Sequence, residues 1–345
     1  MSAASLASRA RALALEVGFD LAGVASAAPP PELARFGEWL ARGYAGEMSY
    51  LGSQAQRRSD LRVAFPWARS VISVALQYDS RAPYSTEAPA DRGWIARYAW
   101  GDDYHDVMTA LLDRLVARLQ ETVGGFRSRR YADTGPIVER AYAAAAGVAA
   151  WGKNTCLLHP ELGSWFFLGE VVTDLDLAPD VPLPDMCGSC TACLEACPTG
   201  ALVEPYRLDA TRCISYLTIE LKGAVPEAQR AGLGRHVFGC DICQDVCPWN
   251  RRRRGSGPPA FAPREGLQAP ELEALAGLDQ EGFRALFRKS AVKRAKRRGL
   301  LRNVAVALGN SGHASRRPAL ERLSRDEDPV VREHAAWALA RLAAP

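Results

Sequence analysis

The first 180 residues alternate between two patterns of apolar positions. Residues 4–17 and 104–123 place apolar side chains three and four apart, which is the spacing of a helix with one buried face. Residues 19–25, 70–76 and 164–173 are short apolar runs, the first two rich in Val and Ile, and such runs are typical of buried strands. The alternation predicts a mixed α/β domain with one core over this part of the chain, 1–180.

The pattern changes after Val181. Proline and cysteine become frequent and long periodic runs disappear, so residues 181–255 need a bound cofactor as the centre of their fold. Residues 256–345 return to a helical pattern. Within them, 300–312 and 330–342 carry an Arg, small apolar residues and Leu at similar offsets, which resembles HEAT-type helical repeats; an ordinary helical bundle is the alternative. The expected fold class is therefore α+β, in three domains.

Charge and targeting signals narrow the class of protein. The first twenty residues interrupt their apolar positions with Arg9, Arg11 and Glu16, unlike a secretory signal, and no stretch reaches the roughly 18 apolar residues of a membrane span. We therefore expect a cytoplasmic protein without membrane contact. The net charge is only +4, but 251–254 is a run of four Arg, and 284–302 holds nine Lys or Arg and no acid.

Nine cysteines in a reducing compartment favour metal binding over disulfides. Eight lie in two runs and one outlier. The run at 187–198 is C-x2-C-x2-C-x3-C-P, which binds [4Fe–4S] clusters in bacterial two-cluster ferredoxins, where the fourth cysteine ligates the other cluster. The run at 240–248 is C-x2-C-x3-C-P and lacks one thiol at its front, which Cys213 can supply. This exchange predicts one cluster on Cys187, Cys190, Cys193 and Cys247 and a second on Cys197, Cys213, Cys240 and Cys243.

Structural zinc is the alternative for these thiols, since C-x2-C pairs also suit tetrahedral thiolate sites. The two x3 spacings, each closed by Cys-Pro, favour clusters. Two clusters with exchanged ligands are close enough to pass single electrons in series. The ninth cysteine, Cys156, stands beside apolar residues, and we expect it to be a buried packing thiol.

Several short motifs, in order along nearly the whole chain, resemble the epoxyqueuosine reductases, which are cobalamin-dependent iron–sulfur enzymes of tRNA modification. The motifs are GEMSYL at 46–51, WGDDYH at 100–105, DTGPIVER at 133–140, WGKNTCLL at 151–158, LGE at 168–170, the two cysteine runs, and LLRNVAVALGN at 300–310. One position departs from some relatives, which carry a Cys where this chain has Ala96, so a thiol contact to the substrate from there is not expected.

The resemblance implies that an epoxide on the wobble base of a tRNA is reduced to an alkene, with electrons from two clusters and cobalamin. It implies that the proton donor is the Asp of the DTG motif, Asp133. A turn whose carboxylate caps the following helix is the alternative for this residue. To hold a proton near neutral pH, Asp133 should have its pKa raised by burial against the corrin.

The resemblance also implies contacts with the corrin and the tRNA. The corrin contacts are Arg58 (or its neighbour Arg57), Asp133, Lys153, Asn154 and the backbone at Leu157 and Leu168; for Arg58 and Lys153 a solvated surface charge is the alternative. The tRNA contacts are Lys222, Lys293, Lys296 and Arg297 on a basic face.

The expected partners are a tRNA with a GUN anticodon and an external low-potential electron donor, and the expected state is a monomer. Two other functions are weighed: a corrinoid reductase of a small molecule, such as a dehalogenase, and a non-catalytic iron–sulfur electron carrier. A carrier does not need a large α/β domain with an intact DTGPIVER motif, and a small-molecule reductase does not need basic helices.

Overall fold

The computed structural model describes every residue except 81, 90, 252–256 and 344–345. Its contacts group the chain into two compact units of discontinuous segments. Unit 1 comprises Met1–Asp79, Tyr104–Cys190 and Pro248–Ala260, and unit 2 comprises Ser80–Asp103, Thr191–Cys247 and Phe261–Pro345. The division into three sequential domains stays a prediction, since it rests on composition along the chain rather than on contacts.

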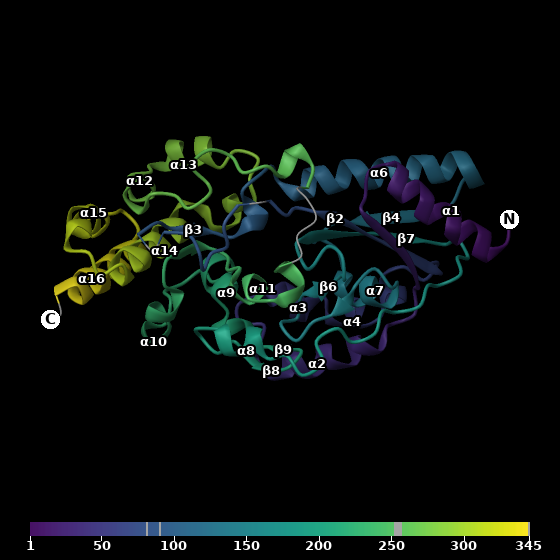
Figure 1. The fold of residues 1–345 in the computed structure, drawn as a ribbon, viewed down its shortest axis with the longest axis horizontal. Coiled ribbons are helices and arrows are strands. Elements are labelled where there is room, and N and C mark those ends of the chain that lie inside the picture. The colour runs from purple at the N-terminus through teal and green to yellow at the C-terminus, as the bar shows by residue number, and fades with distance from the viewer. Residues whose placement is uncertain (81, 90, 252–256, 344–345) are drawn as a thin grey trace. The chain divides into compact units, whose positions relative to one another are not determined.

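The centre of unit 1 is a four-stranded antiparallel sheet in the order β1-β2-β7-β4 (Figure 1). All eight residues of β2 are buried, which explains why this strand reads as a continuous apolar run. The three strands predicted from apolar runs are confirmed, whereas β4 is polar (SRRY) and was not predicted. The strands are β1 (Leu21–Ser26), β2 (Ser70–Gln77), β4 (Ser128–Tyr131) and β7 (Phe166–Thr173).

Helices cover both faces of this sheet (Figure 1). Helices α1 (Ala3–Glu16) and α6 (Tyr104–Val123) confirm the two helices predicted from their periodicity. Helix α6 packs closely on β7 because Gly169 has no side chain; a Cβ there would lie 2.9 Å from Cε of Met108. Helix α7 (Glu139–Ala145) packs against β1, β2 and β7, and its apolar side chains join those of the sheet in one core.

Short elements complete unit 1. The segment between β1 and β2 forms four short helices, and the WGKNTCLL motif forms a small hairpin of two strands. These elements are α2 (Ala34–Ala41), α3 (Ser49–Ser53), α4 (Ala55–Ser59), α5 (Leu61–Ala64), β5 (Ala150–Trp151) and β6 (Leu157–Leu158).

Helix α14 (Lys296–Asn310) is the centre of unit 2. It is buried on all sides from Leu300 to Gly309 and packs against α12 (Leu272–Ala276), α15 (Arg317–Leu323), α16 (Pro329–Ala343) and strand β10 (His236–Phe238). Helices α14 and α16 carry the two similar segments noted in the sequence, and they pack against each other where Gly309 approaches Ala338. Their assignment to a HEAT-type repeat stays a prediction.

The cysteine-rich part of unit 2 contains only short elements, in agreement with its lack of long apolar runs. Strand β10 pairs in parallel with β3, and β8 pairs with β9. The remaining elements of this unit are β3 (Trp94–Ile95), α8 (Ala192–Ala196), β8 (Leu202–Glu204), β9 (Arg207–Leu208), α9 (Ile214–Ile219), α10 (Glu227–Arg230), α11 (Ile242–Asp245) and α13 (Gln280–Leu286).

Candidate functional site

Asp133 stands in a tight turn, residues 132–138, between strand β4 and helix α7; we call this segment the Asp133 turn. The φ angle of Asp133 is 64°, in the left-handed region. Gly135 is required in the turn because a Cβ at this position would lie 2.4 Å from the Tyr131 ring. The N-cap of α7 is Val138, five residues after Asp133. The alternative prediction, that Asp133 caps this helix, is therefore wrong.

The carboxylate of Asp133 is held by two side chains from the start of α6. Tyr104 Oη donates a hydrogen bond to Asp133 Oδ2 at 2.9 Å, and His105 Nε2 lies 3.5 Å from the same oxygen. Tyr104 is itself stacked on Phe167 of β7, with ring centroids 4.3 Å apart. Tyr104 and His105 are functional residues that sequence reasoning missed; their place in the WGDDYH motif was the available signal.

These contacts lower the pKa of Asp133. The hydrogen bond with His105 is the largest cause; burial acts in the opposite direction, and the hydrogen bond from Tyr104 adds to the lowering. Hydrogen-bond donors favour the charged form of a carboxyl group, and the side chain is 62% exposed. In the protein by itself this group is therefore ionised at neutral pH, and the expected rise of its pKa on burial against the corrin stays a prediction.

Two more carboxyl groups lie behind the Asp133 turn. Glu139, the first residue of α7, accepts a hydrogen bond from the Asp133 amide at 2.5 Å. Glu170, in the middle of β7, is fully buried. Burial raises the pKa of Glu139 to about 7, and repulsion from Asp133 adds to this shift. Burial also raises the pKa of Glu170 well above its usual value, and repulsion from Glu139 adds to it.

Arg58 reaches the Asp133 turn from helix α4. It is partly buried, and its Nη1 donates to the Ile137 carbonyl at 3.0 Å. Burial lowers its pKa, and its Nε atom is buried without a hydrogen-bond partner among the residues that the structure describes. The neighbouring Arg57 is exposed. Arg58 is therefore not a solvated surface charge, and it retains a donor for a further ligand.

The hairpin of β5 and β6 adjoins the start of helix α7, directly after the Asp133 turn, because Arg140 Nη1 donates to the Thr155 carbonyl at 2.6 Å. Asn154 is buried at its tip and accepts a hydrogen bond from the Cys156 amide at 3.1 Å. Of the two backbone positions predicted to contact the corrin, Leu157 is buried on β6 and Leu168 is partly buried on β7. Unit 1 thus brings together the segments that carry the predicted corrin contacts, and the contacts themselves stay predictions.

Lys153 is bonded to the first cysteine run. Its buried side chain donates from Nζ to the carbonyls of Gly188 at 2.6 Å and Cys190 at 2.9 Å. Its amide also donates to Cys187 Sγ at 3.4 Å. The alternative of a solvated surface charge is wrong, and these contacts give Lys153 a role in holding the loop between Cys187 and Cys190.

Three cysteines of the second predicted cluster set lie near one another in unit 2, although they are distant in sequence. Burial raises the pKa of Cys240 well above its usual value, and the nearby thiols of Cys213 and Cys197 raise it further. The pKa of Cys213 is raised by burial and, to a lesser extent, by Cys197. A fourth cysteine, Cys243, follows on α11. This geometry agrees with the predicted set, which still stays a prediction.

Backbone amides are directed at the sulfur atoms, as cluster ligands require. The Ala201 amide donates to Cys197 Sγ at 3.3 Å, and although burial raises the pKa of Cys197, hydrogen bonds from Thr199 and neighbouring amides outweigh it and lower the pKa. Across the described ranges, no three His, Cys, Asp or Glu side chains are close enough to hold a single metal ion. The four thiolates of a [4Fe–4S] cluster bind different irons and do not share one ion.

The cysteines of the first predicted cluster set are divided between the two units. Cys187 and Cys190 belong to unit 1, whereas Cys193 and Cys247 belong to unit 2. The first predicted cluster set therefore stays a prediction. Cys156, expected to be buried, is only partly buried.

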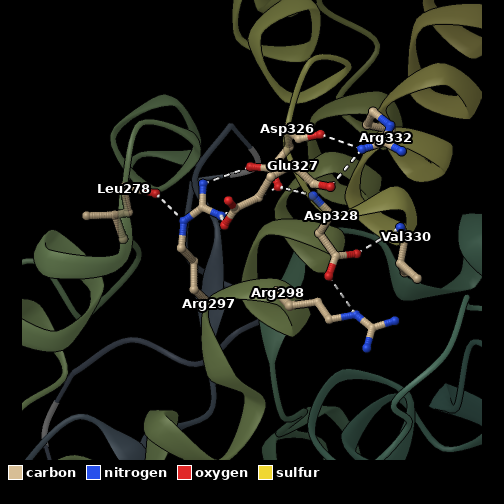
Figure 2. A network of polar contacts seen from close by, with 8 residues as sticks. All are labelled: Leu278, Arg297, Arg298, Asp326, Glu327, Asp328, Val330 and Arg332. Carbon is tan, nitrogen blue, oxygen red and sulfur yellow. Dashed lines mark hydrogen bonds and ion pairs between the residues drawn. The ribbon is translucent and has the colours of Figure 1, made fainter.

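Two arginines of the basic run, at the start of α14, form ion pairs within unit 2 (Figure 2). Arg297 donates to the Leu278 carbonyl at 2.9 Å and pairs with Asp326 at 2.7 Å, with only 17% of its side chain exposed. Arg298 pairs with Asp328 at 3.0 Å. Arg297 therefore connects the start of α14 to two loops, one between α12 and α13 and one between α15 and α16, and its geometry does not support the predicted contact with tRNA.

Lys222, Lys293 and Lys296 are exposed, as their predicted contact with tRNA requires. Of the run 251–254, only Arg251 falls within the described residues, and it is exposed. Ala96, where some relatives carry a Cys, is buried, and a Cβ on Gly239 would lie 2.6 Å from its own Cβ. Apart from the nine residues left undescribed, no helix is long and apolar enough to cross a membrane.

Comparison with known proteins gives two family models that match this chain. Residues 186–250 match a 4Fe-4S double cluster binding domain, and residues 58–134 match the model described as Epoxyqueuosine reductase QueG, DUF1730. The chain therefore contains a double-cluster iron–sulfur domain, at the place where the two cysteine runs predicted one.

Relatives with the same name cover nearly the whole chain. The epoxyqueuosine reductase of Xanthomonas campestris is 41% identical over 97% of this chain and 96% of its own length, and that of Escherichia coli K12 is 39% identical over 97% and 89%. Among solved structures, an epoxyqueuosine reductase with a tRNA-Tyr epoxyqueuosine-modified stem loop is 34% identical, covers all of this chain and 92% of that one, and has a TM-score of 0.91. On this identity and coverage, the chain belongs to the epoxyqueuosine reductase family.

Proposed function

We propose that this protein reduces epoxyqueuosine to queuosine at the wobble position of tRNA, with cobalamin supplied with electrons by two [4Fe–4S] clusters and with a proton from Asp133. Family membership supports the reaction. The observation that supports the site is the Asp133 carboxylate, which is exposed on a strained turn and is contacted by Tyr104 and His105. One relative, from Bacillus subtilis, is described with its aspartate catalytic loop swung out of the active site.

The overall reaction fixes what the site must supply. Conversion of the epoxide to an alkene breaks two C–O bonds, and the oxygen leaves as water after taking up two protons and two electrons. Two clusters that each transfer one electron can together supply the two electrons of the reaction. When bound, cobalamin supplies a strongly reducing cobalt centre for the carbon side of the epoxide.

The residues of unit 1 fit a corrin ligand. Within the described part of the chain the buried Nε of Arg58 has no hydrogen-bond partner, so it is a donor suited to an amide or phosphate oxygen of the corrin side chains. Asn154, Leu157 and Leu168 lie on elements that adjoin the Asp133 turn or share its sheet. Lys153 acts on the corrin site only indirectly, since its ammonium holds the loop of Cys187 and Cys190.

Asp133 is the group that moves a proton. In the protein alone it is ionised, and Tyr104 and His105 orient it. His105 stacks on Tyr104 and lies within reach of the same carboxylate oxygen, so a protonated His105 can return a proton to Asp133 after each turnover. A corrin packed against this turn would remove water from it and raise the pKa of the carboxyl group.

We further propose a tRNA with a GUN anticodon as substrate, an external low-potential reductant as electron donor, a cytoplasmic location and a monomeric state. The basic surface of unit 2, with Lys222, Lys293 and Lys296 exposed, supports binding of a polyanion.

The test is Asp133→Asn in enzyme reconstituted anaerobically with clusters and cobalamin. Asparagine keeps the shape and removes the acid, so the single-turnover rate constant should fall by about 10²–10⁴-fold, the usual contribution of a general acid. The visible spectrum of bound cobalamin should change little. Asp176→Asn, at an exposed surface ion pair with Arg69, is the matched control and should be fully active. Normal turnover by Asp133→Asn would remove this residue from the proposed chemistry.

A further inference from the structure

The Glu139 and Glu170 side chains have no role in the chemistry described so far, yet they lie directly behind the proton donor. Glu170 is on β7, opposite Ser73 of β2 and Tyr131 of β4. Side chains alternate along a strand, so Glu170 points to the same face as Leu168 and Val172, which is the face covered by α7. Glu139 is the first residue of that helix. The fold therefore directs two carboxyl groups toward each other.

The surroundings of Glu170 are unusual for a charged group. None of its side chain is exposed, and neither carboxyl oxygen has a hydrogen-bond donor in the part of the chain that the structure describes. A carboxylate buried without donors is strongly disfavoured relative to the neutral acid. Glu139 is the titratable group that faces it.

Glu139 is surrounded by charges of both signs. Asp133 and Glu170 are the acids that face it, and Arg140 and Arg58 are the bases. Both guanidinium groups donate to backbone carbonyls, Arg140 to Thr155 and Arg58 to Ile137, rather than to Glu139. Two adjacent carboxyl groups in such a site do not both ionise, because repulsion at short range in a low dielectric is too costly.

One carboxyl oxygen of Glu139 is bonded to the backbone of the Asp133 turn. It accepts the hydrogen bond of the Asp133 amide at 2.5 Å, across the Asp133 turn. The turn is strained, with Asp133 in the left-handed region, so it needs such a contact to persist. The state of the Glu139 carboxyl group is thus coupled to the position of the proton donor.

We propose that Glu139 and Glu170 share one proton, and that this singly charged pair is the positioning element that holds the Asp133 turn in place. Glu170 keeps the proton and Glu139 keeps the charge, which strengthens its hydrogen bond to the Asp133 amide. Loss of the shared proton at alkaline pH leaves two adjacent carboxylates, of which that of Glu170 is fully buried; their repulsion separates α7 from β7 at this point and releases the turn. This inference rests on the proposed function only for its effect on turnover.

The first measurement follows the pair without tRNA or cobalamin. In the wild-type protein, infrared spectroscopy should detect the carbonyl stretch of a neutral carboxylic acid at neutral pH, and the band should disappear on alkaline titration. Glu170→Gln keeps the shape and leaves Glu139 as a lone carboxylate, so the band of this pair should be missing at neutral pH in the difference from the wild-type spectrum. Asp241, whose pKa burial also raises to about 7, is present in both proteins and cancels in that difference. The control Glu121→Gln, at an exposed position on α6, should keep the band of the pair.

The second measurement follows the turn by hydrogen exchange at the Asp133 amide. Glu139→Ala removes the acceptor, and exchange should rise about tenfold or more, whereas Glu139→Gln keeps an acceptor oxygen and should rescue most of the protection. In the wild type, the protection of this amide relative to its intrinsic exchange rate at the same pH should fall over the pH range in which the carboxylic acid band is lost. In Glu170→Gln this loss of protection with pH should be absent.

The third measurement is the pH profile of the single-turnover rate constant. The wild type should lose activity as the shared proton is lost, and Glu170→Gln should lack this alkaline limb. A wild-type protein without the neutral-acid band of this pair, or a Glu170→Gln protein that retains it, would overturn the proposal. So would unchanged exchange in Glu139→Ala. Because the first two measurements use no substrate, they decide this inference even if the protein proves to act on another molecule.

Discussion

Replacement of Arg302 by methionine should destabilise unit 2 by about 3 kcal/mol and loosen the second predicted cluster site. Arg302 is buried in α14, and its guanidinium donates to three backbone carbonyls around the end of α9, those of Leu217 at 2.5 Å and of Leu221 and Gly223 at 2.8 Å. Methionine fills a similar volume with no donor. The three carbonyls then lose their partner together.

The magnitude follows from the burial of each carbonyl. The Leu217 carbonyl is bonded in a fully buried environment, so leaving it unsatisfied costs about 3 kcal/mol, the upper end of the usual range. The other two are partly buried and water can replace the missing donor in part, so about 1 kcal/mol each is expected. Part of this total of about 5 kcal/mol is offset, because a guanidinium no longer has to be desolvated. About 3 kcal/mol remains, which is a large fraction of a typical stability.

The consequence for the cluster follows from the neighbouring hydrogen bonds. Asn303, next to Arg302, donates to the carbonyls of Thr218 and Val237, and the Thr218 hydroxyl accepts the Gly239 amide, one residue before Cys240. Helix α9 begins directly after Cys213. Removal of the Arg302 guanidinium should therefore disturb the spacing between two thiols of the second cluster.

Hydrogen exchange with mass spectrometry is the suitable assay, because it reports on each unit separately and a chain of two units need not unfold in one step. Peptides from 213–240 should lose protection in Arg302→Met at low urea concentration under anaerobic conditions, while peptides of the unit 1 sheet should not. Arg322→Met, at an exposed position on α15, is the control. A destabilisation below about 1 kcal/mol would show that these carbonyls do not depend on Arg302.

Three further predictions concern the clusters and the tRNA. Ala in place of Cys187 or of Cys247 should abolish the same paramagnetic signal of the reduced protein and leave the other, whereas loss of two different signals would disprove the exchange of ligands. Lys153→Met should weaken that same signal and lower the iron content, because the carbonyls of the cysteine loop lose their donor; an unchanged iron content would argue against this role. Glu in place of both Lys293 and Lys296 should weaken tRNA binding and leave both clusters intact. The slope of the logarithm of the binding constant against the logarithm of the salt concentration should become shallower by about 0.7 to 0.9 for each phosphate that is no longer bound. An unchanged slope would exclude this face.

The local residue pattern was sufficient to predict most of the long helices and strands and the iron–sulfur chemistry of the cysteines. Helix α6 begins and ends at the predicted residues because its apolar side chains repeat with the helical period, and β2 was evident because both of its faces are buried. The spacing within each cysteine run predicted an iron–sulfur domain, since ligands of one cluster that are close in sequence leave a local signature. Strand β4 was missed because SRRY has neither an apolar run nor a clear alternation.

Only the tertiary structure decided the partners and the pKa values of the charged groups around the candidate site. Tyr104 and Asp133 are 29 residues apart, and Glu139 and Glu170 meet because β7 and α7 happen to pack together, so no local period reveals either pair. The same holds for Arg297, which was predicted to be a surface base and is paired with Asp326 in the loop between α15 and α16. Residue type and spacing fix what a side chain can do, whereas its pKa and its partners depend on which distant segments the fold places against it.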